Sequence, residues 1–356
     1  MTVRRKGVCY DVGRELEGRS WRPDFRPAEV RRELEIIAGD LHCTAVKIHG
    51  AALPRLGWTA QVALERGLET WLAPDLWDHD AEDTLAHIVG AARIAEELRP
   101  AYPGRVFLSV AGELCLFMRG IIPGDTVLER IARPDLGGLL RAKATQELLN
   151  EFLARAATAV RAEFGGPITY CALPTEQVDW TGFDVAGVDL YRDKHSRPHF
   201  GRAVQLFRNK AGGRPLIIGE FGCCTYQGAA DRGGSGFDII DHGGGQPHVD
   251  GDYVRDETGQ AREITECLDI FDAGGADIAF VHTFIQPLSP WNPDPRFDFD
   301  LASYSLVKSF ASRLSELAEE FPEVPWDTTE HGTAYPDMPW EPKESFRAVA
   351  AWNAAH

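Results

Sequence analysis

The sequence is short of basic residues. Its 356 residues include 37 lysines and arginines against 54 aspartates and glutamates, which gives a formal net charge of −17 and a pI near 5.1. Proteins that bind nucleic acid or an anionic membrane surface present clusters of basic side chains. A protein with a large net negative charge is instead repelled by phosphate groups and by anionic lipids. The composition therefore argues against a nucleic-acid partner and against a membrane surface as partner.

Long apolar runs are also missing. No stretch approaches the roughly 18 uninterrupted apolar residues that a membrane-spanning helix needs. The N-terminus, Met1–Lys6, is positively charged, but it leads into Gly7-Val-Cys-Tyr-Asp11 without the apolar core of a secretion signal. We therefore expect a cytoplasmic protein with no membrane segment.

The seven cysteines form no disulfide or redox pattern. Their number is odd and none is part of a Cys-x-x-Cys motif. Five stand in segments that we expect to be interior: Cys9, Cys43, Cys115, Cys171 and Cys267. The adjacent pair Cys223–Cys224 is the expected exception. We expect all seven to be reduced thiols.

Motifs for common cofactors are absent as well. There is no Walker motif, and Gly233-Gly-Ser235-Gly-Phe237 departs from the Gly-x-Ser-x-Gly elbow at its last position. Two acidic clusters have residue types that bind divalent cations, but we interpret both as solvated acidic loops. They are Asp75, Asp78, His79 and Asp80, and Asp294, Asp298 and Asp300. We expect neither a metal nor a cofactor.

The sequence does contain a regular alternation of strand-like and helix-like segments. Eight short apolar runs predict parallel strands covered on both faces. They are Gly7–Gly13, Thr44–Gly50, Glu69–Pro74, Arg105–Glu113, Ile168–Pro174, Asp184–Arg192, Pro215–Gly222 and Asp277–Ile285. Amphipathic segments predict helices at Ala28–Leu41, Gly57–Arg66, Ala81–Leu98, Leu139–Phe164, Gly201–Ala211, Tyr253–Ala273 and Ser303–Phe321. This alternation predicts an α/β fold, a single (β/α)8 TIM barrel.

An open, doubly wound sheet is the alternative architecture. It requires a glycine-rich phosphate turn after the first strand, where the chain has Arg14-Glu-Leu-Glu-Gly18 instead. Two segments are additions to the barrel. Thr225–Asp252 is a long loop after the seventh strand, which we expect over the pocket. We expect residues 323–356 to pack on the outside of a catalytic domain formed by residues 1–322, and nothing in the sequence indicates the oligomeric state.

Polar residues follow the predicted strands at their carboxyl ends, which face the pocket in this fold. Glu113 and Glu220 stand out because an apolar run leads directly into each. A carboxylate in this position loses hydration unless it is paired, so we expect its pKa to be raised. A salt bridge at the rim would explain either residue alone. Their occurrence together, on the fourth and seventh strands, resembles the placement of the acid/base and the nucleophile in the retaining (β/α)8 glycoside hydrolases, and this resemblance implies catalysis.

The run Ile217-Ile-Gly-Glu220-Phe-Gly222 resembles the nucleophile strand of the retaining (β/α)8 glycoside hydrolases, and Tyr191 is placed like an aromatic residue that hydrogen-bonds the nucleophile in some of those families. The resemblance implies a double displacement with Glu220 as nucleophile and Glu113 as acid/base, acting on a sugar-containing small molecule. Further candidates for substrate binding are Asp11, His49, Trp77, Glu176, Trp180, Tyr191, His282 and Trp291. For each tryptophan, ordinary packing is the alternative.

Two positions depart from the glycosidase pattern. Members of that clan usually have Asn before the acid/base residue, where it binds the sugar 2-hydroxyl, and this chain has Gly112. The usual tryptophan of the eighth strand is replaced by His282 or Phe284. These departures favour a small glycoside or glycosylated metabolite over a polysaccharide. They leave open acid–base catalysis on a non-sugar metabolite.

Three segments also resemble a group of actinobacterial proteins labelled "abortive infection protein". They are Lys6–Gly13, Gly112-Glu-Leu114 and Asp294–Tyr304. This resemblance implies a third alternative, a barrel that has lost hydrolysis and acts in binding or phage defence.

Overall fold

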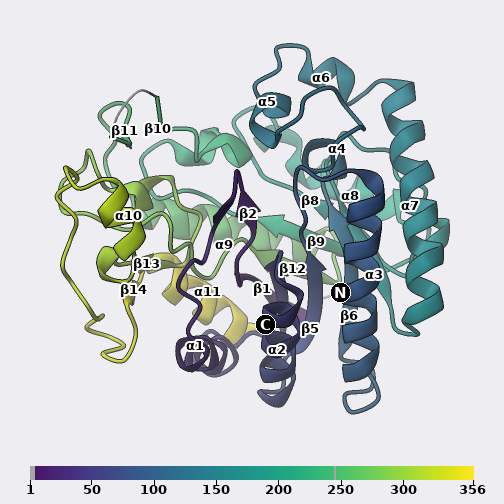
Figure 1. Cartoon of the computed structure of the whole chain (residues 1–356), viewed down its shortest axis with the longest axis horizontal. Helices are drawn as coiled ribbons and strands as arrows, with labels where there is room; N and C mark the ends of the chain where they lie inside the picture. The colour runs from purple at the N-terminus through teal and green to yellow at the C-terminus, as the bar shows by residue number, and fades with distance from the viewer. Residues whose placement is uncertain (1–4, 244–245) are drawn as a thin grey trace.

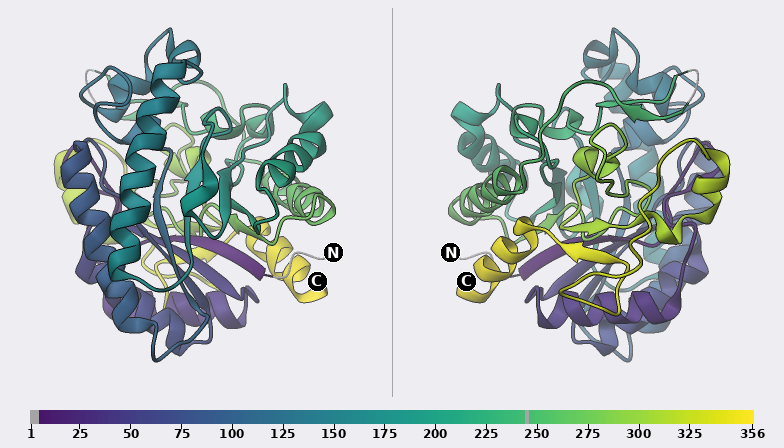
Figure 2. Two further views of the ribbon diagram at one scale, coloured as in Figure 1. Left: turned by 90° about the vertical axis from the view of Figure 1, so that its right-hand side faces the viewer. Right: turned by 90° about the vertical axis from the view of Figure 1, so that its left-hand side faces the viewer.

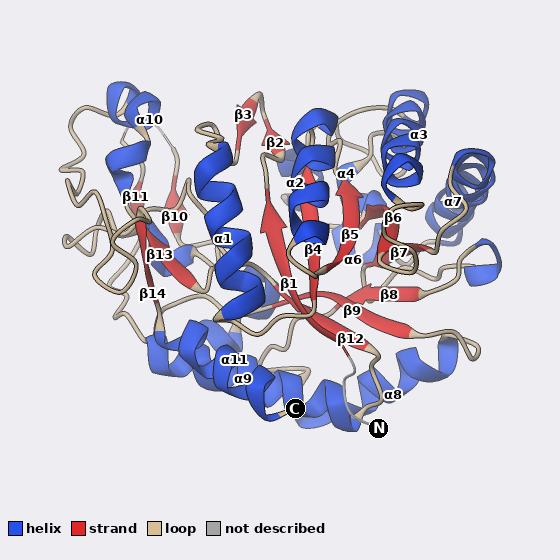
Figure 3. Cartoon of the chain, turned by 90° about the horizontal axis from the view of Figure 1, so that it is seen from below, coloured by secondary structure: helices blue, strands red, loops and turns tan. Residues whose placement is uncertain are grey.

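The computed structural model describes residues 5–243 and 246–356, and its centre is a closed barrel of eight parallel strands (Figure 3). Each strand pairs with the next barrel strand along the chain, and the last closes on the first. The strands are β1 (Arg5–Asp11), β4 (Ala45–Gly50), β5 (Glu69–Pro74), β6 (Val106–Gly112), β7 (Ile168–Ala172), β8 (Ala186–Asp189), β9 (Leu216–Phe221) and β12 (Ile278–Val281). The predicted (β/α)8 barrel is confirmed.

The inside of the barrel is apolar toward the amino ends of the strands and polar toward their carboxyl ends. A buried cluster fills its lower part: Cys9, Ala45, Trp71, Phe107, Cys171, Val185, Ile217, Ile278 and Phe280. The Trp71 ring stacks on Phe107 with centroids 4.3 Å apart. Because side chains alternate along a strand, β4 passes from inward-facing Ala45 through Lys47 to His49 at its carboxyl end. The polar side chains therefore lie at the carboxyl ends of the strands, next to a layer of buried apolar side chains inside the barrel.

Helices surround the barrel, as Figure 3 shows. The long ones are α1 (Pro27–Gly39), α2 (Leu53–Glu65), α3 (Ala81–Leu98), α7 (Lys143–Glu163), α8 (Phe200–Lys210), α9 (Glu257–Ala273) and α11 (Glu344–Ala355). Helix α1 begins at Pro27, since proline fixes φ and needs no hydrogen-bond partner for a backbone N–H in the first turn. At α3, Asp80 accepts hydrogen bonds from the amides of Glu82 and Asp83, both at 3.0 Å.

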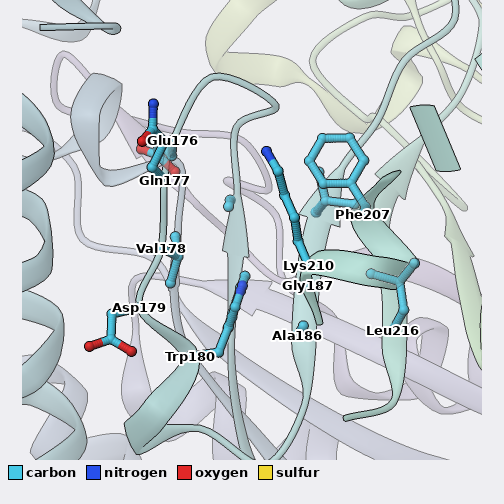
Figure 4. A pocket seen from close by; sticks show the side chains of 12 residues that line it. Glu176, Gln177, Val178, Asp179, Trp180, Ala186, Gly187, Phe207, Lys210 and Leu216 are labelled. Carbon is cyan, nitrogen blue, oxygen red and sulfur yellow. The ribbon is translucent and has the colours of Figure 1, made fainter. Parts of the chain in front are cut away.

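One barrel connection lacks its helix. Between β7 and β8, where every residue is described, the chain forms only the short turn η1 (Trp180–Gly182). No helix therefore packs on the outside of the barrel between these strands, and a cavity of about 370 Å³ lies there. Figure 4 shows Trp180, Phe207 and Leu216 around it. This cavity is on the outside of the barrel wall.

The eighth barrel helix comes from the end of the chain. The predicted helix Ser303–Phe321 is wrong: this segment contains β13 (Val307–Ser309), the turn η6 (Ala311–Arg313) and the short α10 (Ser315–Glu320). β13 pairs with β14 (Trp340–Pro342), and this long-range ladder competes with the local helical pattern. Helix α11 instead covers the barrel, and Figure 2 shows this yellow helix beside the purple strand β1.

Hydrogen bonds fix α11 in this position. Trp352 donates to Asp269 of α9 at 2.8 Å, and Asn353 donates to the carbonyl of Leu41 at 2.8 Å. Helix α11 therefore lies between α9 and the end of α1, and it completes the ring of helices around the barrel. The division of the chain into residues 1–322 and 323–356 stays a prediction.

Several short elements lie above the carboxyl ends of the strands. They are β2 (Glu15–Leu16), β3 (Arg19–Ser20), α4 (Leu114–Phe117), α5 (Val127–Ile131), α6 (Leu136–Leu139), η3 (Ala229–Asp231), η4 (Gly233–Ser235), β10 (Ile240–Asp241) and β11 (His248–Val249). Figure 1 shows α5 and α6 on one side and β10 and β11 on the other. The remaining short turns are η2 (Arg197–His199) and η5 (Phe299–Ala302). The long loop Thr225–Asp252 contains residues 244–245, which lie outside the described part.

The seven cysteines all lie in the interior of the protein. All seven cysteines are buried and unpaired, so the expectation that Cys223–Cys224 lies outside the interior is wrong. In the part of the chain described, none of the helices combines the length and apolar character needed to cross a membrane.

The buried Trp340 tests the contribution of the C-terminal segment to stability. Its ring is 0% exposed, packs edge-on against Phe284, and its Nε1 donates to Glu33 at 3.1 Å. We expect Trp340→Ala to lower the free energy of unfolding by about 3–5 kcal/mol, because it leaves a large cavity. Chemical denaturation measures this loss. The control Trp180→Ala removes a partly exposed ring, and losses of equal size in the two variants would contradict the stabilising role of Trp340.

Candidate active site

Glu220 is the centre of a polar cluster at the carboxyl end of β9. Its Oε2 lies 3.0 Å from His282 Nδ1 and 3.3 Å from the Tyr191 hydroxyl. Its Oε1 lies 3.4 Å from His49 Nε2 and 3.8 Å from both Arg14 Nη1 and Lys47 Nζ. Five polar groups therefore converge on one carboxylate, two from β4 and one each from the segments that follow β1, β8 and β12.

These neighbours keep Glu220 ionised. Burial by itself raises the pKa of a carboxyl group, but His282, Lys47, His49 and Arg14 together lower the pKa of Glu220 below its usual range. Lys47 is 2% exposed, and burial by itself lowers its pKa, but the electrostatic effects of Cys171, Asp189 and Glu220 outweigh burial and raise the pKa. Lys47 therefore stays positively charged beside the Glu220 carboxylate.

Glu113 has the opposite electrostatic environment. It directly follows β6 in a left-handed conformation, with φ 47° and ψ 40°, and its amide donates to the Cys171 carbonyl at 2.9 Å. Burial raises the pKa of Glu113 well above the ordinary value, and repulsion from Asp189, Glu220 and Glu176 adds to this effect. One glutamate is thus held as a carboxylate and the other as a carboxylic acid.

The contacts of His282 define which of its ring nitrogens carries the proton. Arg14 Nη2 lies 3.3 Å from His282 Nε2, and because a guanidinium only donates, Nε2 accepts. The proton is therefore on Nδ1, which lies 2.7 Å from the Tyr191 hydroxyl and 3.0 Å from Glu220 Oε2. Burial lowers the pKa of His282 to about 4, so that neutral imidazole donates to Glu220.

Two more ion pairs fix the groups that touch Glu220. Asp75 Oδ2 lies 2.7 Å from His49 Nδ1, which leaves Nε2 on the side of the nucleophile. Asp11 Oδ2 accepts from Arg14 Nε at 2.5 Å, and its other oxygen accepts from the amides of Gly13 and Arg14. Asp11 and Asp75 thus hold the Arg14 guanidinium and the His49 ring in place beside Glu220.

The structure brings together six of the ten candidate residues predicted from the sequence. Besides Glu113 and Glu220, they are Asp11, His49, Tyr191 and His282. Trp77 is at the edge of this group: it stacks on Phe117 with centroids 4.4 Å apart and lies 5.4 Å from the Arg14 guanidinium. Its ring is therefore held rigidly beside the cluster.

The other three candidates have different surroundings. Glu176 is buried beside Glu113 and accepts from the Tyr170 hydroxyl and from the amides of Leu173 and Cys115. Trp180 lines the outer cavity between β7 and β8. Trp291 packs edge-on against Phe310 in the C-terminal segment.

Arg14 is the functional residue that sequence reasoning missed. It follows β1 by three residues and was considered only as a poor match to a phosphate turn. Its guanidinium lies 4.5 Å from the centroid of Trp21 and contacts Asp11, His282 and Glu220. The Asp11-x-x-Arg14 spacing at a strand end was the available signal.

The polar cluster also contains a set of potential metal ligands. Cys9, His49 and Glu220 present ligand atoms that all lie within 4.8 Å of one another. Lys47 and Arg14 are each 3.8 Å from the same Glu220 oxygen, and their charges repel a divalent cation. This donor set therefore fits a cation poorly.

The acidic clusters that the sequence offered as alternatives have protein partners. In the first, Asp80 caps α3, Asp78 pairs with Arg130, and Asp75 holds His49. In the second, Arg255 pairs with Asp298 at 2.8 Å and with Asp300 at 3.0 Å. These contacts use the oxygens that a metal would need.

Comparisons with known proteins support the fold. No protein-family model and no curated protein matches the sequence. Among solved structures, a GH113 β-1,4-mannanase is similar with a TM-score of 0.60 and 10% identity, over 100% of this chain and 99% of the other. The GH113 β-mannanase of Alicyclobacillus acidocaldarius gives a TM-score of 0.57 and 14% identity, over 99% and 97%.

A glycoside hydrolase family 5 enzyme from Prevotella bryantii gives a TM-score of 0.52 and 12% identity, over 84% of this chain and 96% of the other. Nothing in these comparisons supports the resemblance to proteins labelled "abortive infection protein". The chain shares its (β/α)8 barrel with glycoside hydrolases of these families.

The tautomer and pKa of His282 are directly measurable. NMR titration of the histidine rings is expected to give one pKa near 4, with the proton on Nδ1 at neutral pH. Because the folded pKa is below the unfolded value of about 6.5, stability is lost as pH falls from about 6.5 through 4, by up to about 3 kcal/mol. His282→Asn should remove this part of the pH dependence. A ring that titrates near 6.5 would contradict the assignment.

Proposed function

We propose that this protein is a retaining glycosidase that acts on a small glycoside or a glycosylated metabolite. The observation that carries the proposal is the opposite displacement of the pKa values of Glu113 and Glu220. Two carboxyl groups with these protonation states are what a glycosidase requires of its acid and its nucleophile. The likeness to solved glycoside hydrolases supports the same chemistry.

The proposed reaction is a double displacement. The Glu220 carboxylate attacks the anomeric carbon and forms a glycosyl ester, while the Glu113 carboxylic acid gives its proton to the departing oxygen. Glu113, now a carboxylate, then takes a proton from water, whose oxygen attacks the same carbon. The ester bond breaks, and both glutamates return to their starting states.

The neighbours of Glu220 have separate roles in this scheme. The Tyr191 hydroxyl and His282 Nδ1–H donate to Oε2, which leaves Oε1 as the attacking oxygen. Lys47 and Arg14 stabilise the carboxylate before attack and after release of the sugar. Trp77, held against Phe117, offers an apolar face to the sugar ring.

The surroundings of the site favour a small substrate. Only 14% of the Glu220 side chain is exposed, and the side chains of His282 and Arg14 are 10% and 6% exposed. Such low exposure suits a terminal sugar better than the interior of a polymer. Since two of the similar structures are β-mannanases, aryl β-mannosides are the first substrates to try.

Removing the nucleophile tests the proposal. We expect wild-type protein to hydrolyse at least one of a panel of aryl glycosides, and Glu220→Ala to lose about 10⁴-fold or more in kcat because no ester forms. Azide should restore turnover by attacking the anomeric carbon from the vacated space. NMR of the product should show a glycosyl azide of inverted configuration.

Removing the acid has a different signature. Glu113→Gln is expected to reduce kcat/KM by about 10²–10⁴-fold for poor leaving groups and far less for dinitrophenolates, which need no proton. Asp179→Asn, which changes an exposed carboxylate, is the control and should retain full activity. If folded wild-type protein hydrolyses no glycoside, the proposal is wrong and the site serves binding or a non-sugar substrate.

A further inference from the structure

Glu176, in the loop after β7, is a buried carboxyl group with three hydrogen bonds to the protein. It is 6% exposed. Its Oε1 accepts from the Cys115 amide at 3.1 Å, and its Oε2 accepts from the Tyr170 hydroxyl at 2.8 Å and from the Leu173 amide at 2.9 Å. A buried carboxylate needs such donors to replace its lost hydration. Since Cys115 follows Glu113 by two residues, these bonds tie Glu176 to the segment that carries the proposed acid.

Glu113 has a backbone conformation that the surrounding structure must enforce. Its φ of 47° and ψ of 40° lie in the left-handed region, which is unfavourable for a residue with a side chain. Its carbonyl accepts from the amides of Leu116 at 2.8 Å and Phe117 at 3.1 Å, so the chain turns directly into α4. The first amides of a helix have no acceptor within the helix. The amides of Leu114 and Cys115 therefore need partners from elsewhere.

Tyr170 and Glu176 supply these partners. The Leu114 amide donates to the Tyr170 hydroxyl at 2.8 Å, and the Cys115 amide donates to Glu176. Tyr170, on β7, is 0% exposed, and its hydroxyl in turn donates to Glu176. The hydroxyl therefore accepts and donates at once, and the two side chains act as one hydrogen-bonded pair on the backbone that follows Glu113.

The loop that carries Glu176 is anchored on α7. This loop takes the place of the helix that is missing between β7 and β8, and Figure 4 shows Glu176 and Gln177 at the side of the outer cavity. The Gln177 amide donates to Gln146 at 2.5 Å, and the Asp179 amide donates to Asn150 at 2.7 Å. The carboxyl group of Glu176 therefore has a position fixed by α7, from which it holds the end of β6.

We propose that Tyr170 and Glu176 are positioning residues for Glu113: by binding the amides of Leu114 and Cys115, they hold Glu113 in the left-handed conformation from which it gives its proton to the leaving oxygen. This role rests on the proposed function, in which Glu113 is the acid. Without the pair, two buried amides lose their acceptors, and Glu113 relaxes toward the conformations that a residue with a side chain prefers. Its carboxyl group then moves, and a displacement of about 1 Å costs a catalytic group about 10²-fold in rate.

Two conservative substitutions test the pair. Tyr170→Phe removes only the hydroxyl. Glu176→Gln replaces one carboxyl oxygen by a nitrogen, which donates and so cannot accept; if the remaining oxygen keeps the two donors of Oε2, the nitrogen faces the Cys115 amide. Tyr335→Phe is the matched control, because it also removes a tyrosine hydroxyl from a carboxylate, that of Asp40 at the end of α1.

The first readout needs no substrate. Hydrogen exchange followed by NMR should show protected amides at Leu114 and Cys115 in wild-type protein, and the ¹³Cα and ¹³Cβ shifts of Glu113 should report the left-handed conformation. We expect Tyr170→Phe to speed exchange at Leu114, and Glu176→Gln at Cys115, by at least about tenfold, because each amide loses its acceptor. The Glu113 shifts should change in both variants. Tyr335→Phe should leave all of these signals unchanged.

Activity separates positioning from a general loss of stability. We expect Tyr170→Phe and Glu176→Gln to reduce kcat by about 10–100-fold for poor leaving groups, with KM unchanged and dinitrophenolates hardly affected, because only proton transfer is impaired. A purely structural defect would lower the rates of both substrates in the same proportion. Tyr335→Phe should keep full activity.

Unchanged amide exchange and unchanged Glu113 shifts in both variants overturn the positioning role, whether or not the protein hydrolyses glycosides. A loss of kcat that is equal for good and poor leaving groups also overturns it. Faster exchange and altered Glu113 shifts, with no turnover of any glycoside by wild type, overturn the proposed function alone.

Discussion

The negative charge of Glu220 is the constraint on which the rest of the site depends. A carboxylate with 14% of its side chain exposed has lost most of its hydration, and only neighbouring donors and cations can replace it. Lys47 and His49 of β4, with Arg14, His282 and Tyr191, do so from four positions around the barrel. Arg14 and His49 are themselves buried and require their own partners, which brings Asp11 and Asp75 into the cluster.

The barrel makes this arrangement possible. Parallel strands deliver their carboxyl ends to one face, and the alternation of side chains directs every second residue inward. The same geometry places Glu113, Asp189 and Glu220 on strands four, six and seven without a cation for each. The resulting excess of acid over base separates the protonation states of the two glutamates, and this separation is the property that the proposed chemistry uses.

The strands and most helices could be predicted from the sequence because their signals are local. Buried parallel strands are apolar throughout, as in Ile217 and Ile218, and the helices begin at residues such as Pro27 that favour helix starts. The segment Ser303–Phe321 was predicted wrongly, since its pairing partner at Trp340–Pro342 lies about thirty residues further along. A local helical pattern carries no information about such a partner.

For the site, the sequence by itself determined which acids stand at strand ends: Glu113 and Glu220 each follow an apolar run, and the fold class then assigns them to one face. Only the tertiary structure decided which side chains surround them. Arg14 and Lys47 reach Glu220 across the barrel, and Asp189 fits beside Gly112 and Gly219 because three strands converge there. Burial and distance, which arise when the barrel closes, set the pKa values, and neither quantity is a property of any single segment.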